Sequence, residues 1–412
     1  MRKAFKYRIS PTKKQEQKLF WVLSRCRELY NAALTERRDA YNFHVRQHPN
    51  YYDEPTRKQL TKELTVGYYE QKGMLPEIKS ELREEYQDIY SQVLQDVLLR
   101  LERAFAAFFR RCKEHAEEPG FPRFQGQNRY DSFTYPQTSG FSLTHDNRVT
   151  LSKIGSIKVK MHRPLEGKMK TCTIKHEAGH WYVIFSCEVA EIEPLPVGNS
   201  EIGIDLGVTH FAALSDGTFI DNPRHLRHGQ ATLKRRQQAL AKKKRGSHRR
   251  KKAVKLVAKA HRKIANQRRD FHHKHSTQLV QQHQTIVFEE LQIINLTKHA
   301  KPKQDENGTY LPNGAAAKSG LTKSILDAGW GQFQHMCVNK AACAGRVVLF
   351  VNPRYTSQVC STCGTVRKKS LEERWHSCEC GCELDRDTNA AVNILRLGRS
   401  QRRETCVEAP PF

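Results

Sequence analysis

The chain has 412 residues and a net charge of +27, because 70 lysines and arginines outnumber 43 aspartates and glutamates. This excess is far larger than solubility requires and predicts a polyanionic partner. No run of about 18 apolar residues occurs and the basic N-terminus has no apolar core, so we expect neither a membrane span nor a secretory signal.

The first half of the chain changes from a helical to an extended pattern. The stretch RKAFKYRISP favours a short strand, and a helix capped by Thr12 is expected to follow it. Apolar residues keep a helical spacing from about residue 56 to residue 115. Between residues 130 and 195, short alternating runs separated by turn residues predict a small sheet or barrel.

Two histidine motifs are weak metal candidates. HEAGH, from His176 to His180, matches the zinc-protease pattern, but that pattern requires a helix. Its flanks alternate as strands do, and Gly179 lies where a hairpin would turn, so we reject a protease site. FHHKH, residues 271–275, lies in a basic helical segment, and its histidines are expected to face a phosphate backbone or solvent.

The linker-like stretch EIEPLPVGNS precedes a second half with the pattern of an α/β domain. From Glu201, the sequence predicts a strand, a turn and a second strand, and QTIVFEELQ predicts an apolar strand that ends at Glu289. A helix over SILDAGWGQFQHMCVNKAACAG and a strand over RVVLFVNP should follow. A last helix is expected from Asp387, and the tail from Gly398 is expected to be poorly ordered.

Residues 233–275 are dense in lysine and arginine and contain one acidic residue, Asp270. Apolar residues recur every four positions, which predicts a helical hairpin with one packed stripe, broken at Gly246-Ser247. The alternative is a solvated charged face. If nucleic acid binds, its affinity should fall steeply with salt because each neutralised phosphate releases counterions. The expected contacts are Lys242, Lys243, Lys244, Arg245, Arg249 and Arg250.

Five of the twelve cysteines cluster between residues 360 and 382, which is typical of a metal site rather than of free thiols. Zinc favours four thiolates in a tetrahedron, and a site with four protein ligands is structural. The expected ligands are Cys360, Cys363, Cys378 and Cys380. Cys382 competes for one position in the irregular second half-site, and His376 is a more remote candidate.

Asp205 lies inside the apolar stretch IGIDLGV. An acidic residue in such a strand is costly unless it binds something or lies at an exposed sheet end. Gly203 and Gly207 leave room beside it for a ligand or a closely approaching backbone.

Two further carboxylates lie at the ends of predicted elements. Glu289 ends a strand, and Glu290 should face the other way because side chains alternate. Asp387 begins a helix, whose N-terminus stabilises anions, and Asp385 is its rival. With Asp205, they can converge on a pair of Mg²⁺ ions that would promote hydrolysis of a phosphodiester.

Motifs along nearly the whole chain resemble the TnpB proteins of bacterial insertion sequences, compact RuvC-type nucleases related to the ancestors of type V CRISPR effectors. The matching stretches are LYNAAL, GFPRF, GIDLGV, FEEL, DAGWGQF, SQVCSTCG and CGCELDRDTNAAVNIL. Each stretch alone is unspecific, but together they are highly specific.

The resemblance extends to single residues. The family's RuvC carboxylates match Asp205, Glu289 and Asp387, and three of its zinc ligands match Cys360, Cys363 and Cys380. Many members space the second cysteine pair by two residues, which would place Ser377 in this chain at a ligand position, so Cys378 must serve instead.

The resemblance implies an α+β multidomain fold. Its parts would be an RNase H-like (RuvC) α/β nuclease domain with a zinc-finger insertion, a helical recognition domain and a small β-barrel wedge domain. The implied boundaries are 1–45 and 119–195 for the wedge domain, 46–118 for the recognition domain, 200–355 for the nuclease domain with a basic helical hairpin at 230–275, 356–384 for the zinc finger, 385–398 for the end of the nuclease domain and 399–412 for a disordered tail.

The resemblance also implies an RNA-guided DNA endonuclease. Such a protein binds a transposon-derived guide RNA, recognises a short target-adjacent motif, opens double-stranded DNA and cuts with one Mg²⁺-dependent site. We would then expect a bacterial cytoplasmic, nucleoid-associated monomer in a ribonucleoprotein, with Gln95 and Thr134 among the motif-reading residues. The alternatives are a guide-independent RuvC-like nuclease acting in transposition and an RNA-guided DNA-binding regulator that does not cut.

Overall fold

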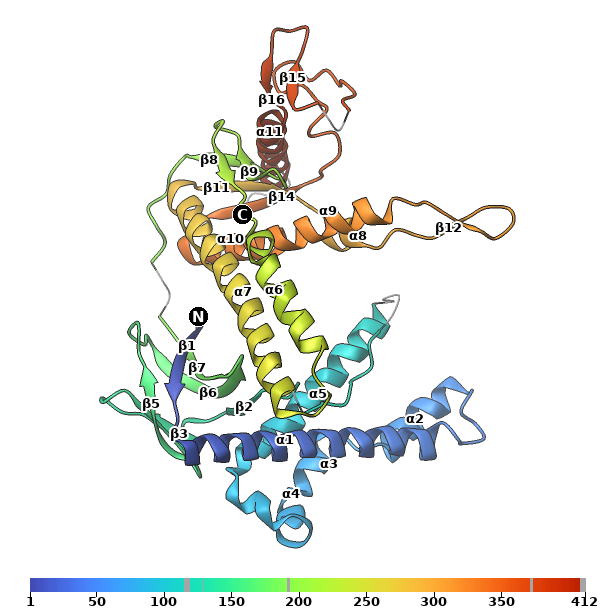
Figure 1. The fold of residues 1–412 in the computed structure, drawn as a ribbon, viewed down its shortest axis with the longest axis vertical. Coiled ribbons are helices and arrows are strands. Elements are labelled where there is room, and N and C mark those ends of the chain that lie inside the picture. The colour runs from blue at the N-terminus through green and yellow to red at the C-terminus, as the bar shows by residue number, and fades with distance from the viewer. Residues whose placement is uncertain (115–118, 128, 191–192, 371–372, 408–412) are drawn as a thin grey trace. The chain divides into compact units, whose positions relative to one another are not determined.

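The protein is described by a computed structural model that covers residues 1–114, 119–127, 129–190, 193–370 and 373–407 (Figure 1). The chain divides into two compact units, Met1–Ala190 and Glu191–Phe412, and each is described by itself. Within the described ranges, no helix is both long enough and apolar enough to cross a membrane.

The first unit combines long helices with a sheet (Figure 1). Its helices are α1 (Lys13–Ala40), α2 (Glu54–Leu64), α3 (Tyr68–Gly73), α4 (Leu75–Glu77) and α5 (Ser91–Lys113). Its strands are β1 (Arg2–Ser10), β2 (Ser132–Tyr135), β3 (Phe141–Leu143), β4 (Arg148–Leu151), β5 (Gly155–Lys160), β6 (Lys168–Glu177) and β7 (His180–Glu188). Thr12 caps α1 as expected, because its hydroxyl accepts a hydrogen bond from the Gln15 N–H at 3.3 Å.

The sheet of this unit is antiparallel and has the strand order β2-β6-β7-β1-β5-β4-β3. Strand β1 lies in its middle although it starts the chain, so residues near both ends of the unit build one sheet. Apolar residues of α1 and α5 pack on the sheet in a single core that includes Leu19, Leu94 and Phe185. Among the described residues no pairing joins β2 to β3, so closure into a barrel stays a prediction.

HEAGH forms the turn of the β6–β7 hairpin. Glu177 pairs with His180, and both turn residues, Ala178 and Gly179, have positive φ, 47° and 80°. Two residues with positive φ are typical of a tight hairpin turn and not of a helix. The rejection of a helical zinc-protease motif is therefore confirmed.

The second unit is a sheet between helices. Its strands are β8 (Glu201–Leu206), β9 (His210–Leu214), β10 (Phe219–Asp221), β11 (Thr285–Glu289), β12 (Lys303–Gln304), β13 (Tyr310–Leu311), β14 (Val347–Val351), β15 (Trp375–Ser377) and β16 (Glu383–Asp385). Its helices are α6 (His225–Ala241), α7 (His248–Gln282), α8 (Ile293–Thr297), α9 (Ala315–Ala328), α10 (Trp330–Ala344) and α11 (Arg386–Val407).

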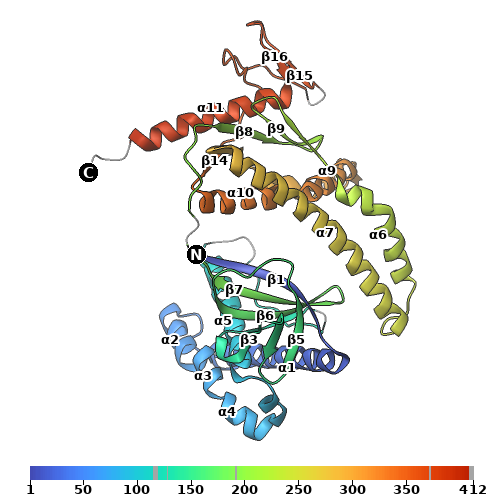
Figure 2. The same cartoon turned by 90° about the vertical axis from the view of Figure 1, so that its left-hand side faces the viewer.

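The main sheet of this unit has the order β10-β9-β8-β11-β14. Strands β8, β9 and β10 are antiparallel neighbours, whereas β11 is parallel to both β8 and β14. Helix α11 covers one face, and α7 and α10 lie on the other (Figure 2). Each face has its own core, with Ile204 and Phe288 on the α10 side and Val287 and Ile394 on the α11 side.

Helix α11 continues past Gly398 to Val407, where the sequence analysis expected regular structure to have ended. The physical reason is packing and charge. Gly398 lies against Val287 of β11, and the Arg399 guanidinium donates to the Glu201 carboxylate at 2.6 Å. Residues 408–412 lie outside the described residues.

Candidate active site and metal centre

Asp205 and Glu289 lie on one face of the main sheet. In the parallel pair β8–β11, Ile204 is opposite Phe288, and the next residue on each strand is one of these two carboxylates. Neighbouring side chains in register point to the same side, and alternation places both carboxylates opposite to Ile204 and Phe288. This is the face that α11 covers, and both residues are half-buried.

Helix α11 brings Asp387 to the same place. A Cβ on Gly203 would lie only 2.1 Å from the Ala391 carbonyl oxygen, so the backbone of α11 touches β8 there. From this contact, Asp205 lies two strand residues away, about 6.6 Å, and Asp387 lies four helical residues away, about 6 Å. The structure therefore brings the three predicted carboxylates together at one end of the sheet, while their catalytic role is a proposal.

The electrostatics of the three carboxylates reflect this proximity. Burial raises the pKa of Asp205 well above its usual range, and the charges of Glu289 and Asp387 raise it further. Burial also raises the pKa of Glu289 and of Asp387. The nearby Arg386 cation acts in the opposite direction on both aspartates. Clustered carboxylates that repel one another favour a bound cation.

The two rival carboxylates have other positions. Asp385 accepts hydrogen bonds from the backbone N–H groups of Asp387 and Thr388, at 2.8 and 3.2 Å, and so caps α11. Glu290 follows the end of β11, is exposed, and donates its backbone N–H to the Val351 carbonyl at 2.9 Å. Glu290 is thus separated from Glu289. The Asp385 charge still raises the pKa of both Asp205 and Asp387, so Asp385 lies beside the carboxylate cluster and stays the rival of Asp387.

Thr356 contacts the site but was not among the expected residues. Its side chain is buried, and its hydroxyl donates a hydrogen bond to the Glu289 carboxylate at 2.5 Å. This bond lowers the pKa of Glu289, opposing the effect of burial, and holds one carboxylate oxygen in place. No sequence pattern marks Thr356, because the threonine and the glutamate are far apart along the chain.

The four cysteines expected to bind zinc lie together. The sulfurs of Cys360, Cys363, Cys378 and Cys380 all lie within 4.8 Å of one another. Cys360 is 3.6 Å from Cys380, and Cys363 is 3.5 Å from Cys378. Four sulfurs on a tetrahedral zinc, with Zn–S near 2.3 Å, would be about 3.8 Å apart. The cluster therefore fits a structural zinc site with the Cys-x-Cys second half-site.

Two turns shape the cysteine cluster. Gly364 and Gly381 have φ values of 79° and 83°, which bend the chain after each half-site. Several hydrogen bonds lower the pKa of Cys363 to about 6, and the largest effect comes from the Thr365 hydroxyl, 3.3 Å from the Cys363 sulfur. The lower pKa favours the thiolate that zinc binds.

Cys382 and His376 form a second group. Their ligand atoms lie within 4.8 Å of each other and of Cys360, and both side chains are buried. His376 also contacts Lys369 through its Nδ1 atom. Because Cys360 belongs to both groups, the four-cysteine set and this three-residue set compete for one sulfur.

Two asparagines fasten the cysteine segment to α11. Asn389 accepts the Ser361 N–H at 2.9 Å and donates to the Val359 carbonyl at 2.8 Å. Asn393, one helical turn later, donates to the carbonyls of Val359 and Thr356 at 2.7 and 2.9 Å. Both side chains are buried, so these bonds are shielded from water. The sequence analysis did not single out either asparagine.

The predicted basic hairpin exists and is longer than expected. Helices α6 and α7 meet at a turn that contains Gly246, with φ of 84°, and Ser247 caps α7. Lys242, Lys243, Lys244, Arg245 and Arg249 are exposed around this turn. Arg250 differs, because its guanidinium donates to the carbonyls of Leu240 and Lys243 at 3.1 Å and closes the turn. The nucleic-acid contacts themselves stay predictions.

His272 does not face a phosphate backbone or solvent, so that expectation is wrong. Its ring is fully buried against Phe211 and Phe333, and Nε2 lies 2.8 Å from the Ala328 carbonyl. Burial lowers the pKa of His272 to about 4, which keeps the ring neutral. The histidine lies on the apolar stripe of α7 rather than on its basic face.

Gln95 and Thr134 lie on elements of the first unit that contact each other, α5 and β2. The Thr134 hydroxyl accepts a hydrogen bond from Arg100 at 2.7 Å and lies 2.8 Å from the Thr173 hydroxyl. Gln95 is half-buried. Their predicted role in reading a target-adjacent motif stays a prediction.

Family models match three segments of the chain. The OrfB_IS605 model, described as "Probable transposase", matches residues 184–300, which include Asp205 and Glu289. The "Cas12f1-like, TNB domain" model matches residues 330–394, which include the cysteine cluster and Asp387. A "Helix-turn-helix domain" model matches residues 1–44, where the structure has β1, α1 and a π-helical end.

Relatives match over almost the whole length. A protein of Streptomyces pristinaespiralis named "Putative RNA-guided DNA endonuclease" is 33% identical over 405 residues, 97% of this chain and 90% of the relative. The chain belongs to the TnpB/OrfB family. A second TnpB relative, "Putative RNA-guided DNA endonuclease InsQ" of Escherichia coli K12, is 33% identical and covers 96% of this chain and 92% of its own. The solved Cas12f1-sgRNA-target DNA complex aligns with 96% of the chain and 99% of its own, at 14% identity and a TM-score of 0.32.

Proposed function

We propose that this TnpB-family protein is an RNA-guided DNA endonuclease that hydrolyses phosphodiesters at Asp205, Glu289 and Asp387. The observation that carries the proposal is the pairing register, which sets Glu289 level with Asp205 on the face where α11 adds Asp387. The relatives' names and the basic α6–α7 hairpin support the guide and DNA parts. The layered five-stranded sheet supports an RNase H-like (RuvC) assignment.

The three carboxylates fit Mg²⁺, because they are oxygen ligands whose mutual repulsion a divalent cation would relieve. A bound pair of ions would supply stabilisation of negative charge on the phosphodiester oxygens and a more acidic water. The chain's own residues do the positioning. The Thr356 hydroxyl holds Glu289, the Asp385 cap fixes the first turn of α11, and Gly203 lets that helix approach β8.

We propose a structural role for zinc at Cys360, Cys363, Cys378 and Cys380. A zinc with four protein ligands has no open position for substrate. The cysteine segment contacts α11 through Asn389 and Asn393, so a folded knuckle would hold the helix that carries Asp387. Guide RNA and double-stranded target DNA are the proposed partners of the whole protein.

The carboxylate site is tested by substituting Asp205, Glu289 and the neighbouring Glu290 in turn and measuring DNA cleavage. Asp205→Ala and Glu289→Gln should abolish Mg²⁺-dependent cleavage of target DNA while RNA still co-purifies with the protein. Glu290→Gln, one residue further and exposed, should cleave as the unmodified chain does. Cleavage that persists in Asp205→Ala would refute the site.

Sequencing the RNA that co-purifies from cells carrying the protein's own locus separates the remaining alternatives. A single RNA species with a variable end, which redirects cleavage when that end is changed, supports the guided endonuclease. Cleavage that ignores the RNA would favour a guide-independent nuclease, and guided binding without cleavage would favour a regulator.

A further inference from the structure

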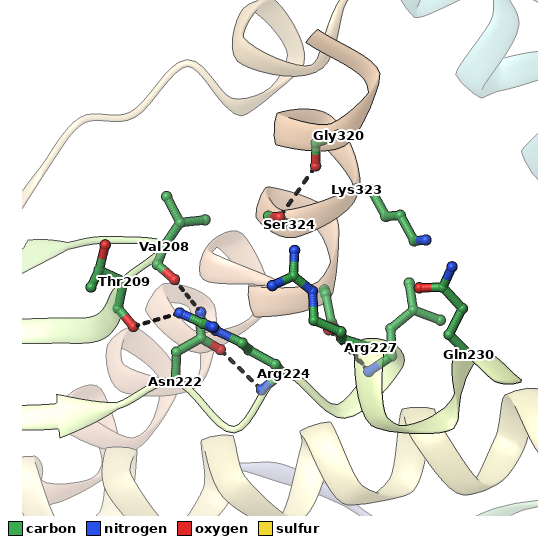
Figure 3. A pocket seen from close by; sticks show the side chains of 11 residues that line it. Val208, Thr209, Asn222, Arg224, Arg227, Gln230, Gly320, Lys323 and Ser324 are labelled. Atoms are coloured by element: carbon green, nitrogen blue, oxygen red, sulfur yellow. Dashed lines mark hydrogen bonds between the residues drawn. The ribbon is translucent and has the colours of Figure 1, made fainter. Parts of the chain in front are cut away.

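A cavity of about 500 Å³ opens in the second unit between α6, α9 and the turn after β8 (Figure 3). Residues Val208–Thr209 form one wall, and residues from Asn222 to Gln230 form the second. The third wall is one face of α9, where residues 320, 323, 324 and 327 recur at helical spacing. We call it the α6–α9 pocket. Its volume lies within the usual range of about 300–1,000 Å³ for small-molecule sites.

The pocket is strongly positive. Arg224, Arg227 and Lys323 line it, and the one acidic lining residue is Asp327. That carboxylate is already neutralised, because it forms an ion pair with Arg268 at 3.1 Å and accepts a backbone N–H of α6 at 2.9 Å. Three cations therefore face the cavity without a carboxylate left to balance them.

Two of these cations are available to a ligand. Within the described part of the chain, the side chains of Arg227 and Lys323 make no ion pair or hydrogen bond, and both are exposed. Figure 3 shows the Arg227 guanidinium reaching towards Ser324, with the end of Lys323 near Gln230. The Gln230 amide and the Ser324 hydroxyl thus lie beside the cations. Together these groups could bind a ligand that has both negative charge and hydrogen-bonding groups.

The base of the pocket is held rigidly. Asn222 donates to the Val208 carbonyl at 2.9 Å and accepts the Arg224 N–H at 3.1 Å. The Arg224 guanidinium reaches the Thr209 carbonyl at 3.5 Å (Figure 3). A preformed wall costs a ligand little ordering entropy when it binds.

The pocket adjoins the carboxylate site along the chain. Val208 follows Asp205 by three residues, a span of at most about 10 Å. Strand β9, which begins at His210 directly after this turn, contacts α11, so the turn lies near the helix that carries Asp387. A nucleic-acid strand held at the carboxylates can therefore extend past this turn into the pocket.

We propose that the α6–α9 pocket binds one nucleotide of the DNA strand presented to the carboxylates, with its backbone phosphate on Arg227 and Lys323. The inference rests on the proposed nuclease function and adds a substrate subsite to it. Cations supply phosphate affinity, and the cavity volume accommodates a whole nucleotide rather than a bare phosphate. The pocket then orients the strand, which leaves the scissile bond at the carboxylates.

The experiment uses the full chain purified with its bound RNA and a labelled DNA target complementary to that RNA's guide segment. Single-turnover cleavage is measured for the unmodified protein and for Arg227→Ala/Lys323→Ala over a range of salt concentrations. The double variant should cleave about 10- to 100-fold more slowly, because substrate orientation is lost. Its rate should also depend less on salt, with the log–log slope reduced by about one for the lost phosphate contact.

Three controls accompany the double variant. Lys318→Ala, on α9 but outside the pocket, should cleave normally. Arg227→Lys should keep most of the rate, because it keeps the charge. Arg227→Gln/Lys323→Gln keeps side-chain bulk and decides the result if the alanine pair melts at a lower temperature.

Two results would overturn the proposal. Normal cleavage by both double variants would show that the pocket does not hold the strand. Loss of co-purified RNA would show that the pocket holds the guide instead of the DNA. Asp205→Ala, measured in parallel, tests the nuclease site separately, since an inactive Asp205→Ala beside a normal double variant rejects the pocket alone.

Discussion

Gly203→Ala is the substitution that tests most directly how α11 delivers Asp387 to the site. The new Cβ would lie 2.1 Å from the Ala391 carbonyl oxygen and 2.7 Å from the Leu395 nitrogen, both of which are backbone atoms. An acceptable carbon–oxygen contact is about 3.3 Å, so strand and helix must separate by roughly 1.2 Å. The separation moves Asp387 away from Asp205.

The expected cost can be stated for both activity and stability. A displacement of about 1 Å at a catalytic group can lower the rate roughly 10²-fold. Overpacking of a core typically costs about 1–3 kcal/mol of the free energy of unfolding. The Mg²⁺ concentration that gives half the maximal rate should rise, because carboxylates that have moved apart hold the ions less well.

The assay measures cleavage by the RNA-bound protein across a Mg²⁺ titration, together with urea unfolding. Gly198→Ala is the control, because a Cβ there meets nothing within 4 Å. If the cleavage rate of Gly203→Ala stays within threefold of that of the unmodified chain at every Mg²⁺ concentration, close packing of α11 on β8 does not position Asp387, and the reasoning is refuted.

Three other substitutions test single contacts of the site. Thr356→Val should slow cleavage about tenfold. Because the Thr356 hydroxyl lowers the pKa of Glu289, its removal should raise that pKa and move the acid limb of the pH–rate profile to higher pH. An acid limb that does not move would contradict this. Without Mg²⁺, Asp205→Asn should stabilise the protein by about 0.5–2 kcal/mol at pH 8. The pKa of Asp205 is raised in the folded state, so the folded protein binds this proton more tightly than the unfolded chain does, and its stability falls as pH rises above the unfolded pKa. The stability gained by Asp205→Asn should therefore vanish near pH 3, where the aspartate is protonated in both states. Urea unfolding at pH 8 and at pH 3 checks this difference. Cys380→Ser should lose zinc, measured by atomic emission, whereas Cys382→Ser should keep one zinc per chain; the reverse result would favour the competing ligand set.

Most residues of the candidate site could be predicted from the sequence because short stretches of sequence mark them. Asp205 and Glu289 each interrupt or end an apolar strand, where a charge is conspicuous. The cysteine spacing marks a metal cluster without any knowledge of the fold. Gly203 beside Asp205 indicated a close approach, and the approaching backbone is that of α11.

The residues that escaped prediction are polar groups whose partners are distant in the chain. Asn389 and Asn393 recur one helical turn apart, but the carbonyls they bind lie about thirty residues earlier. His272 looked like part of a charged run, although its position on the stripe of α7 buries it. The helix beyond Gly398 was missed because the partners that hold it, Val287 and Glu201, are more than a hundred residues away.

The placement of Asp387 on α11 has a consequence for synthesis in the cell. Glu289 emerges from the ribosome 98 residues before Asp387, an interval of roughly 5 to 20 seconds at the usual rate of translation. During that interval the nascent chain already displays its basic hairpin but holds only two of the three carboxylates. Under the proposed nuclease function, a growing polypeptide therefore exposes its basic hairpin before its carboxylate site is complete.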